Sequence, residues 1–213
     1  MIDWTDITHY GDVTITSLAA AAIAAWLFIE DEKRLAIWWS ALYAGGMGIV
    51  VATKMAFIGW GIGIPAIDFA GFSGHAMRSA AVMPVLFYLI LQRTHMALRV
   101  GGVMLGLTFS LLVGVSRVVL HAHSVSEVVA GLWLGAAIGL AFIRVAHGCL
   151  STHVFKPLRI VLSMLVLLPA PYVHPAPTQK WLTELTMYFS NHEQPFARGE
   201  WRWERQPRPP AAY

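Results

Sequence analysis

Long apolar stretches without charged residues, separated by short charged turns, are the feature that most constrains this chain. Six of them follow one another, at residues 13–29, 35–53, 79–92, 100–116, 128–143 and 160–173. A helix needs about 20 apolar residues to cross a bilayer, with a lower limit near 17. Several stretches reach this length only if the charged residues at their ends snorkel to the interface, and Pro169 and Pro171 interrupt the end of the last one. The pattern predicts an all-α, polytopic membrane helical bundle of about six transmembrane helices.

Composition excludes several other classes of protein. Of the 213 residues, 57% are hydrophobic and 13% are charged, whereas an average soluble domain is about 25% charged. This excludes an ordinary soluble domain and a disordered chain. No basic face interleaved with aromatic residues suggests a nucleic-acid partner, and the single cysteine, Cys149, cannot form an internal disulfide. The acidic N-terminal segment lacks the basic region of a cleaved signal peptide, so we expect the first stretch to remain as an anchor.

The distribution of basic residues predicts the orientation of the bundle. The turns near 30–34, 93–99 and 144–159 lie on one face and hold Lys33, Arg34, Arg93, Arg99, Arg144, Lys156 and Arg159. The positive-inside rule makes this face cytoplasmic. The N-terminus, the 59–73 loop, the 117–123 turn and the C-terminal tail then face outward. We expect a bacterial inner (cell) membrane protein; the arginines of the tail argue mildly against this orientation, but they lie more than about 20 residues beyond the last stretch.

The chain divides into two parts by composition. Residues 1–174 form the predicted transmembrane bundle, and residues 175–213 form a predicted interfacial helix followed by an extended C-terminal tail. The helix is expected because its large apolar side chains share one helical face: Trp181, Leu182, Leu185, Tyr188 and Phe189. From Glu200 onward the tail is either disordered or a binding segment.

Ionisable residues at the ends of the apolar stretches are the main functional signal. A charged residue at membrane depth costs a few kcal/mol or more and therefore marks a candidate site. The predicted topology brings such residues together on the outward face, from three separate segments: Lys54, His75, Arg78, Arg117, His121, His123 and Glu127. Lys54 also fits an interfacial lysine that snorkels. His121 lies two residues from His123 and points elsewhere on a helix, so we expect it to be interfacial.

The tripeptide Ser73-Gly74-His75 begins the third apolar stretch after a glycine-rich loop. Ser73 is a good N-cap, and the free N–H groups at a helix start attract anions. His75, in the first turn, would be placed to exchange protons with a bound anion. The alternative is that Ser73 only caps the helix and that His75 is an interfacial histidine.

His123 and Glu127 are four residues apart, which on a helix puts them within hydrogen-bond reach. A carboxylate behind an imidazole fixes the tautomer and leaves the other ring nitrogen as a base or nucleophile. Gly131, Gly135 and Gly139 continue this face, and small residues at this spacing predict close packing against another helix. The alternative is a buried pair that only ties helices together.

These residues carry a resemblance to a known family. Ser116-Arg117, followed by His123 and Glu127, resembles the motif Ser-Arg-x5-His-x3-Asp of the type 2 phosphatidic acid phosphatase family. Ser73-Gly74-His75 is similar to the family's Pro-Ser-Gly-His motif, and Lys54 is similar to the start of its Lys-x6-Arg-Pro motif. The resemblance covers about residues 50–140 and implies a bundle of about six spans with a non-cytoplasmic site.

The chain departs from the family pattern at several positions. Gly61 and Ile62 stand where the first motif has Arg-Pro, Phe72 replaces the proline of the second motif, and Glu127 replaces the aspartate of the third. The missing arginine removes one phosphate clamp. Arg78, one turn beyond His75, is the nearest cation that would replace it; the alternative is that Arg78 only snorkels.

The resemblance implies a phosphoric monoester or diphosphate hydrolase that needs no metal and no cofactor. His123 would attack phosphorus and form a phosphohistidine, and Glu127 would orient it. His75 would protonate the leaving oxygen and then activate water. The groups expected to hold the phosphoryl oxygens are Lys54, Ser73, Gly74, Arg117 and, as the replacement, Arg78. A zinc site built from His75, His121 and His123 is not expected, because this spacing at a helix start does not converge.

The expected partner is a lipid phosphate in the membrane, whose head group reaches the site from water. Undecaprenyl diphosphate, phosphatidylglycerol phosphate and phosphatidic acid all fit, and the residues do not choose among them. One alternative is a catalytically weak relative that binds lipid phosphate. Another is a small transporter or proton relay, although the chain lacks the paired repeats typical of transporters.

Overall fold

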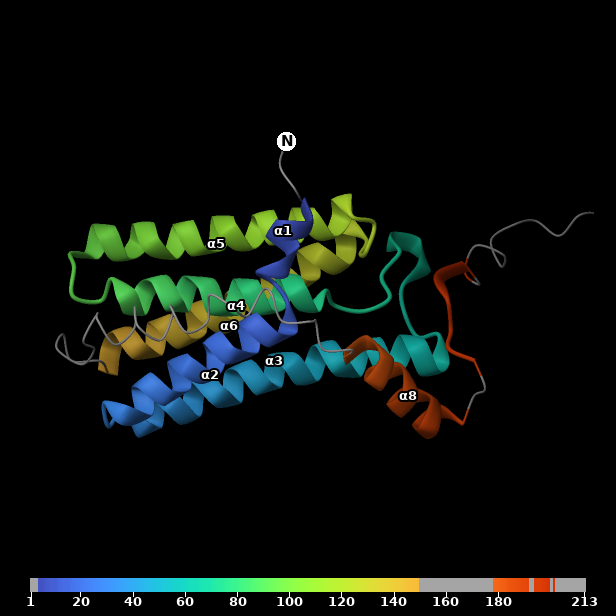
Figure 1. Ribbon diagram of the computed structural model, residues 1–213, viewed down its shortest axis with the longest axis horizontal. Coiled ribbons are helices and arrows are strands. Elements are labelled where there is room, and N and C mark those ends of the chain that lie inside the picture. Colours follow the sequence, from blue (N-terminus) through green and yellow to red (C-terminus); the bar gives the residue numbers. More distant parts are fainter. Residues whose placement is uncertain (1–3, 150–177, 192–193, 200, 202–213) are drawn as a thin grey trace, which may run out of the picture.

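The computed structural model describes residues 4–149, 178–191, 194–199 and 201. The helices run in the order α1 (Trp4–His9), α2 (Val13–Ile29), α3 (Lys33–Trp60), the short 3-10 helix η1 (Pro65–Ile67), α4 (Gly74–Ile90), α5 (Met96–Val119), α6 (Val125–Cys149) and α8 (Thr178–Ser190) (Figure 1). Within these residues no β-strand forms, and an isolated bridge joins Ile64 to Phe69. The predicted all-α, membrane-type bundle is confirmed.

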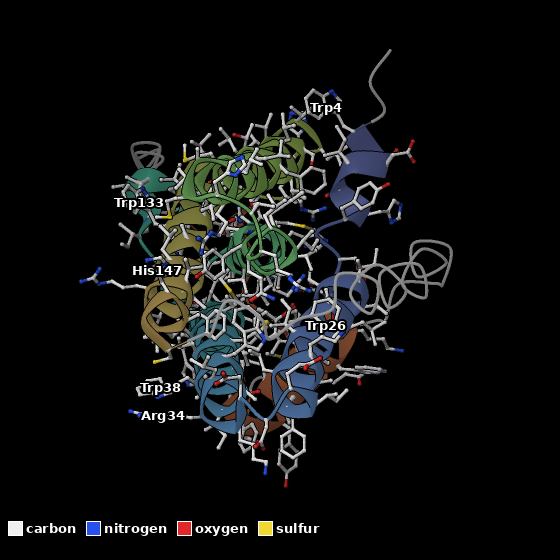
Figure 2. The ribbon with its side chains drawn as sticks, turned by 90° about the vertical axis from the view of Figure 1, so that its left-hand side faces the viewer. Trp4, Trp26, Arg34, Trp38, Trp133 and His147 are labelled. Carbon is white, nitrogen blue, oxygen red and sulfur yellow. The ribbon has the colours of Figure 1, made fainter. Side chains whose placement is uncertain are left out.

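The helices match the predicted apolar stretches closely. α3, α5 and α6 are long and apolar enough to cross a membrane, and α2 and α4 are shorter apolar helices of 17 residues each. These properties indicate an integral membrane protein. The sixth predicted stretch, at 160–173, lies outside the described residues. Trp38 and Trp133 point away from the bundle (Figure 2), as expected for side chains that face lipid.

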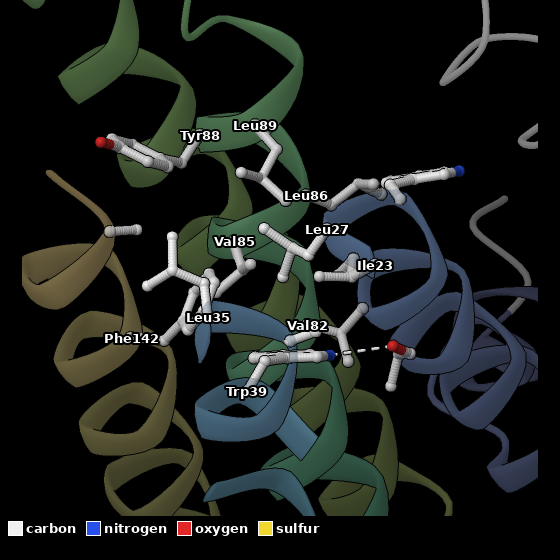
Figure 3. Packing of buried hydrophobic residues seen from close by; sticks show 14 of the residues in the cluster. Ile23, Leu27, Leu35, Trp39, Val82, Val85, Leu86, Tyr88, Leu89 and Phe142 are labelled. Carbon is white, nitrogen blue, oxygen red and sulfur yellow. Dashed lines mark hydrogen bonds between the residues drawn. The ribbon is translucent and has the colours of Figure 1, made fainter. Parts of the chain in front are cut away.

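α4 is the central helix, and its side chains are buried along almost its whole length. It packs against α2, α3, α5 and α6, which explains how a helix of only 17 residues is stable here. The largest apolar core lies between α2, α3, α4 and α6 (Figure 3). There the indole N–H of Trp39 donates to the carbonyl oxygen of Ala20 at 2.8 Å, and its ring meets Phe142 edge to face.

The predicted glycine face of α6 packs closely against α4. A Cβ atom on Gly131 would lie 2.6 Å from the carbonyl oxygen of Ser73, and one on Gly139 would lie 2.9 Å from that of Ala81. Neither position has room for a side chain without moving backbone. The close approach brings the starts of α4 and α6 together, and the N–H of Ser73 donates to the carbonyl oxygen of Glu127 at 3.1 Å.

The connections of the bundle lie at its two ends (Figure 1). The α2–α3 turn, the α4–α5 turn and the end of α6 lie at one end, whereas the 61–73 segment, the α5–α6 turn and α8 lie at the other. The segments that carry the predicted site therefore converge, as the apolar pattern implied. Which end faces the cytoplasm stays a prediction.

Candidate active site

A cavity of about 840 Å³ opens at this second end of the bundle, between α3, α4, the α5–α6 turn and α8. Every residue that sequence reasoning assigned to the site lines it, except Ser73. Its ionisable lining residues are Lys54, His75, Arg78, Arg117, His123, Glu127 and Arg198. The last of these was not expected. The cavity thus combines several cations with one carboxylate and two histidines.

His123 and Glu127 form the predicted pair, with His123 Nδ1 2.7 Å from Glu127 Oε2. The reason given from the four-residue spacing is wrong, however, because α6 begins only at Val125. His123 instead lies in the turn after α5, where its N–H donates to the carbonyl oxygen of Arg117 at 3.2 Å. His121, at a φ of 53°, helps to reverse the chain there. Its side chain is exposed and does not line the cavity.

The Glu127 carboxylate is almost completely buried, with 1% of its surface exposed, and both of its oxygens accept hydrogen bonds. Oε1 accepts the N–H of Ala70 at 2.8 Å. Oε2 accepts His123 Nδ1, the N–H of Ser124 at 3.2 Å and Nη2 of Arg198 at 2.5 Å. Buried charges persist only when they are paired and hydrogen-bonded in this way. Because the carboxylate accepts at Nδ1, the Nε2 atom of His123 is the ring nitrogen left for chemistry.

Burial lowers the pKa of His123 below its ordinary value of 6.5. The hydrogen bond to Glu127 raises this pKa, while the positive charges of Lys54 and Arg117 lower it further, and the net direction is downward. The imidazole is therefore neutral at neutral pH. A neutral imidazole with a free Nε2 is the form that acts as a nucleophile or base.

Two of the expected cations reach the cavity from α3 and α5. Lys54 lies near the end of α3, and its Nζ is 3.5 Å from Oε1 of Gln179 on α8. Arg117, in the last turn of α5, donates through Nη1 to Thr8 Oγ1 at 2.9 Å. Its buried Nε–H has no hydrogen-bond partner. An unpaired buried donor beside a cavity is suited to an anionic ligand, since leaving it unpaired costs about 1–3 kcal/mol.

Arg78 is 7% exposed and lies inside the bundle, so it does not snorkel to the interface. Its Nε donates to Thr16 Oγ1 at 3.1 Å and its Nη2 to the carbonyl oxygen of Gly11 at 3.2 Å. A Cβ atom on Gly74 would come within 2.8 Å of Nη1. Arg78 therefore ties the α1–α2 turn to α4, and its guanidinium group lines the cavity beside the start of α4.

Ser73 occupies the N-cap position of α4, but its hydroxyl does not make the predicted capping hydrogen bond. The side chain is fully buried, its Oγ has no hydrogen-bond partner, and it does not line the cavity. Gly74, the first residue of α4, does line it. The start of α4 therefore faces the cavity, with an unpaired hydroxyl directly behind it.

The segment after α8 packs against the bundle as far as it is described. The tail predicted from Glu200 onward lies outside the described residues, apart from Trp201. The N–H of Phe196 donates to the carbonyl oxygen of Ile58 at 2.9 Å, and Trp201 is buried against the ring of Phe57. Between them, Arg198 reaches Glu127 and lies 3.4 Å from Asp68 Oδ2. The signal that was available is the pair of aromatic residues, Phe196 and Trp201, in a segment otherwise rich in polar residues and proline.

A helix, α8, forms at the position predicted for the interfacial helix; its place at the membrane interface stays a prediction. Trp181, Leu185, Tyr188 and Phe189 are exposed on it, while Thr186 is buried. Trp181, Leu182 and Leu185 also line the cavity. Among the residues placed in the structure, no three His, Cys, Asp or Glu side chains come together as a metal site.

The fold and the site together define an integral membrane helical bundle with a histidine–carboxylate pair in a cationic cavity. The profile of the PAP2 superfamily matches residues 67–150, which hold the second and third motifs. An "Uncharacterized 22.5 kDa protein in cps region" of Klebsiella pneumoniae is 37% identical over 206 residues, covering 92% of this chain and 96% of that protein. The chain belongs to the PAP2 superfamily, and this membership supports phosphatase activity. No solved structure matches the chain significantly.

Proposed function

We propose that this chain is a lipid phosphate or lipid diphosphate phosphatase that acts through a phosphohistidine at the outward face of a bacterial inner membrane. In this proposal residues 1–174 hold the catalytic bundle, and residues 175–213 hold the interfacial helix and the segment after it. The observation that carries the proposal is the hydrogen bond between His123 Nδ1 and Glu127 in the cationic cavity. It leaves Nε2 of a neutral imidazole as the nucleophile.

The reaction has two steps. In the first, a bond forms between His123 Nε2 and phosphorus while the bond from phosphorus to the leaving oxygen breaks, and His75 gives that oxygen a proton. In the second, a water oxygen attacks phosphorus, the bond to Nε2 breaks, and His75 takes a proton from the water. The anionic substrate offsets the positive charge around His75 and so favours its protonated form before the first step.

The remaining groups hold the phosphoryl oxygens. Phosphoryl transfer depends mainly on positioning and on positive charge around three equatorial oxygens. Lys54, Arg78 and Arg117 line the cavity and supply that charge. The N–H groups at the start of α4, from Gly74 onward, add a site for an anion. We assign Ser73 to the same group: its unpaired hydroxyl does not line the cavity, and it would reach a phosphoryl oxygen by rotating toward the start of α4.

A lipid substrate is supported by the apolar wall of the cavity. Besides the ionisable groups, the lining includes apolar side chains from α3 and α8: Met47, Val50, Val51, Phe57, Ile58, Trp181, Leu182 and Leu185. A phosphate at the charged end would leave its acyl or prenyl chains along this wall. Apolar surfaces at such a wall favour hydrocarbon over water by about 25 cal/mol per Å². The wall suits phosphatidic acid and undecaprenyl diphosphate equally.

The proposal is tested by phosphate release from phosphatidic acid and from a prenyl diphosphate, with the purified protein in lipid nanodiscs containing EDTA. We expect release by the natural chain and none by His123→Ala. The matched control is His121→Asn, which changes the exposed histidine and tolerates its positive φ; it should keep full activity.

Each other outcome has a defined meaning. Full activity in His123→Ala contradicts the assignment of the nucleophile. Tight binding of lipid phosphate by the natural chain without any turnover would identify a binding protein instead.

A further inference from the structure

The C-terminal strap, defined as α8 together with residues 194–199 and Trp201, packs along the end of α3 and contributes an arginine to the cavity. α8 and the residues after it supply nine of the lining positions, among them Gln179, Phe196 and Arg198. The strap is therefore a wall of the site rather than an appendage. What Arg198 does there is not explained by the two-step reaction above.

The strap docks on positions that lack side chains. A Cβ atom on Gly59 would lie 2.8 Å from Thr186, and one on Gly61 would lie 2.9 Å from the ring of Phe196. Gly61 also has a φ of 65°, which favours glycine. Larger residues at these positions would push the strap away from α3. The chain is thus built to hold this segment, and with it Arg198, at a fixed place.

Trp201 anchors the strap on the C-terminal side of Arg198. Its ring packs edge to face on Phe57, with centroids 4.9 Å apart, and it is buried with Ile58 and Ala70 in one small apolar cluster. A Cβ atom on Gly63 would lie 2.5 Å from this ring. Phe196 and Trp201 therefore anchor the backbone on both sides of Arg198, so the guanidinium group is positioned by packing as well as by charge.

Arg198 pairs with two carboxylates, Glu127 and the partly exposed Asp68, but Glu127 does not depend on it for its hydrogen bonds. Nη2 lies 2.5 Å from Glu127 Oε2, and the side chain remains 32% exposed. Glu127 would still accept three other hydrogen bonds, from Ala70, His123 and Ser124, if Arg198 moved. These hydrogen bonds, together with the positive charge that the His123 ring gains on phosphorylation, would hold the buried carboxylate after the arginine leaves it. A phosphoryl group carries up to two negative charges and can accept two parallel hydrogen bonds from one guanidinium group.

We propose that Arg198, held in place by the C-terminal strap, is a phosphate-binding residue. When substrate fills the cavity, the guanidinium group leaves Glu127 and binds the phosphoryl oxygens instead. This rests on the proposed function. Gly61 is the position at which the resembled family's first motif has its arginine. In this chain that position is covered by Phe196, and a cation reaches the cavity two residues further along the strap.

The first test replaces the guanidinium group. We expect Arg198→Ala to lower kcat/KM about 10- to 100-fold, mainly by raising KM. Arg198→Lys should have a kcat/KM between those of the natural chain and Arg198→Ala, because lysine keeps the charge but cannot make the two-point contact of a guanidinium group. Added guanidinium ion should partly restore Arg198→Ala. The matched control is Lys180→Ala, a cation of the same strap that is 74% exposed and lies outside the cavity lining; it should change kcat/KM less than twofold.

The second test displaces the strap without changing any charge. Gly61→Ala places a methyl group against Phe196 and should lower kcat/KM as Arg198→Ala does. If both changes remove the same contact, the double variant is no worse than Arg198→Ala alone. If the losses in kcat/KM of the two single variants multiply in the double variant, the strap does not position this arginine and its proposed role is overturned.

The outcomes separate this proposal from the proposed function. Suppose that the natural chain releases phosphate and His123→Ala does not. If Arg198→Ala then has an unchanged KM and is not rescued by guanidinium ion, Arg198 has only a structural role and the proposal is overturned. If the natural chain releases no phosphate, binding of inorganic phosphate is measured by calorimetry. Weaker binding by Arg198→Ala then supports the proposal, and equal binding overturns it.

Discussion

Glu127→Gln removes the charge of the buried carboxylate while keeping the size of the side chain. An amide presents one oxygen and one NH2 group, whereas both oxygens of Glu127 face N–H donors. Whichever way the amide turns, its NH2 group points at a donor. The better orientation puts the oxygen toward His123, Ser124 and Arg198 and sets the NH2 group against the N–H of Ala70.

The magnitude follows from counting these contacts. The N–H of Ala70 is left unpaired and buried, which costs about 1–3 kcal/mol. The hydrogen bonds from His123 and Arg198 lose their charge assistance, worth about 1 kcal/mol each. We therefore expect a loss of roughly 3–5 kcal/mol in the free energy of unfolding. We also expect kcat to fall by about 10²–10⁴, because the charged imidazole that forms during reaction loses its counter-ion.

Two measurements check this prediction. Thermal unfolding in detergent reports stability, where roughly 3 kcal/mol corresponds to about 6–12 °C for a chain of this size. Phosphate release under single-turnover conditions reports the chemical step. Glu184→Gln is the matched control, because Glu184 is exposed on α8 and lies 3.9 Å from Lys180; exposed pairs contribute about 0–1 kcal/mol. A Glu127→Gln variant that unfolds like the natural chain and keeps kcat within threefold would refute the reasoning.

Three further predictions concern pH, packing and metal. Burial lowers the pKa of His123, and the nucleophile must be neutral to react. A plot of kcat/KM against pH should therefore rise to its plateau with a midpoint below pH 6.5, and this midpoint should be the same for different lipid substrates. A common midpoint above pH 6.5 contradicts this. Gly139→Ala places a methyl group 2.9 Å from the carbonyl oxygen of Ala81, so thermal unfolding should show a loss of about 1–3 kcal/mol in the stability of the fold. Gly45→Ala is the control, because a methyl group there has no atom within 4 Å, and it should leave stability unchanged. Activity should persist in EDTA, because the imidazole nucleophile needs no metal; loss on chelation that zinc restores would indicate a metal site.

Much of the bundle follows from local sequence. Charged residues bound the apolar stretches, so they predict α2 with its observed bounds. The glycines of α6 predict close packing against another helix, which the structure identifies as α4. Convergence of the ionisable residues followed from alternating the direction of successive helices. These are properties of neighbouring residues and of chain direction, which a sequence pattern records.

The finer geometry of the cavity depended on contacts that the pattern does not record. The four-residue spacing predicted His123 next to Glu127, but the pair forms across a reversed turn rather than along a helix. Ser73 stands at its predicted cap position with an unpaired hydroxyl. Arg198 lies 71 residues from Glu127, and its place depends on two aromatic residues packing over glycines. Such a contact has no periodicity by which it could be found.

The distance along the chain between Glu127 and Arg198 sets an order in which the cavity is assembled during synthesis. At about 5–20 residues per second, a ribosome adds Arg198 roughly 4–14 s after Glu127. During that interval the nascent chain already holds the imidazole and its carboxylate, but the strap arginine has not been made. If Arg198 binds phosphate as proposed, a partly synthesised chain would bind phosphate poorly, and full affinity would be reached only once the strap docks on α3.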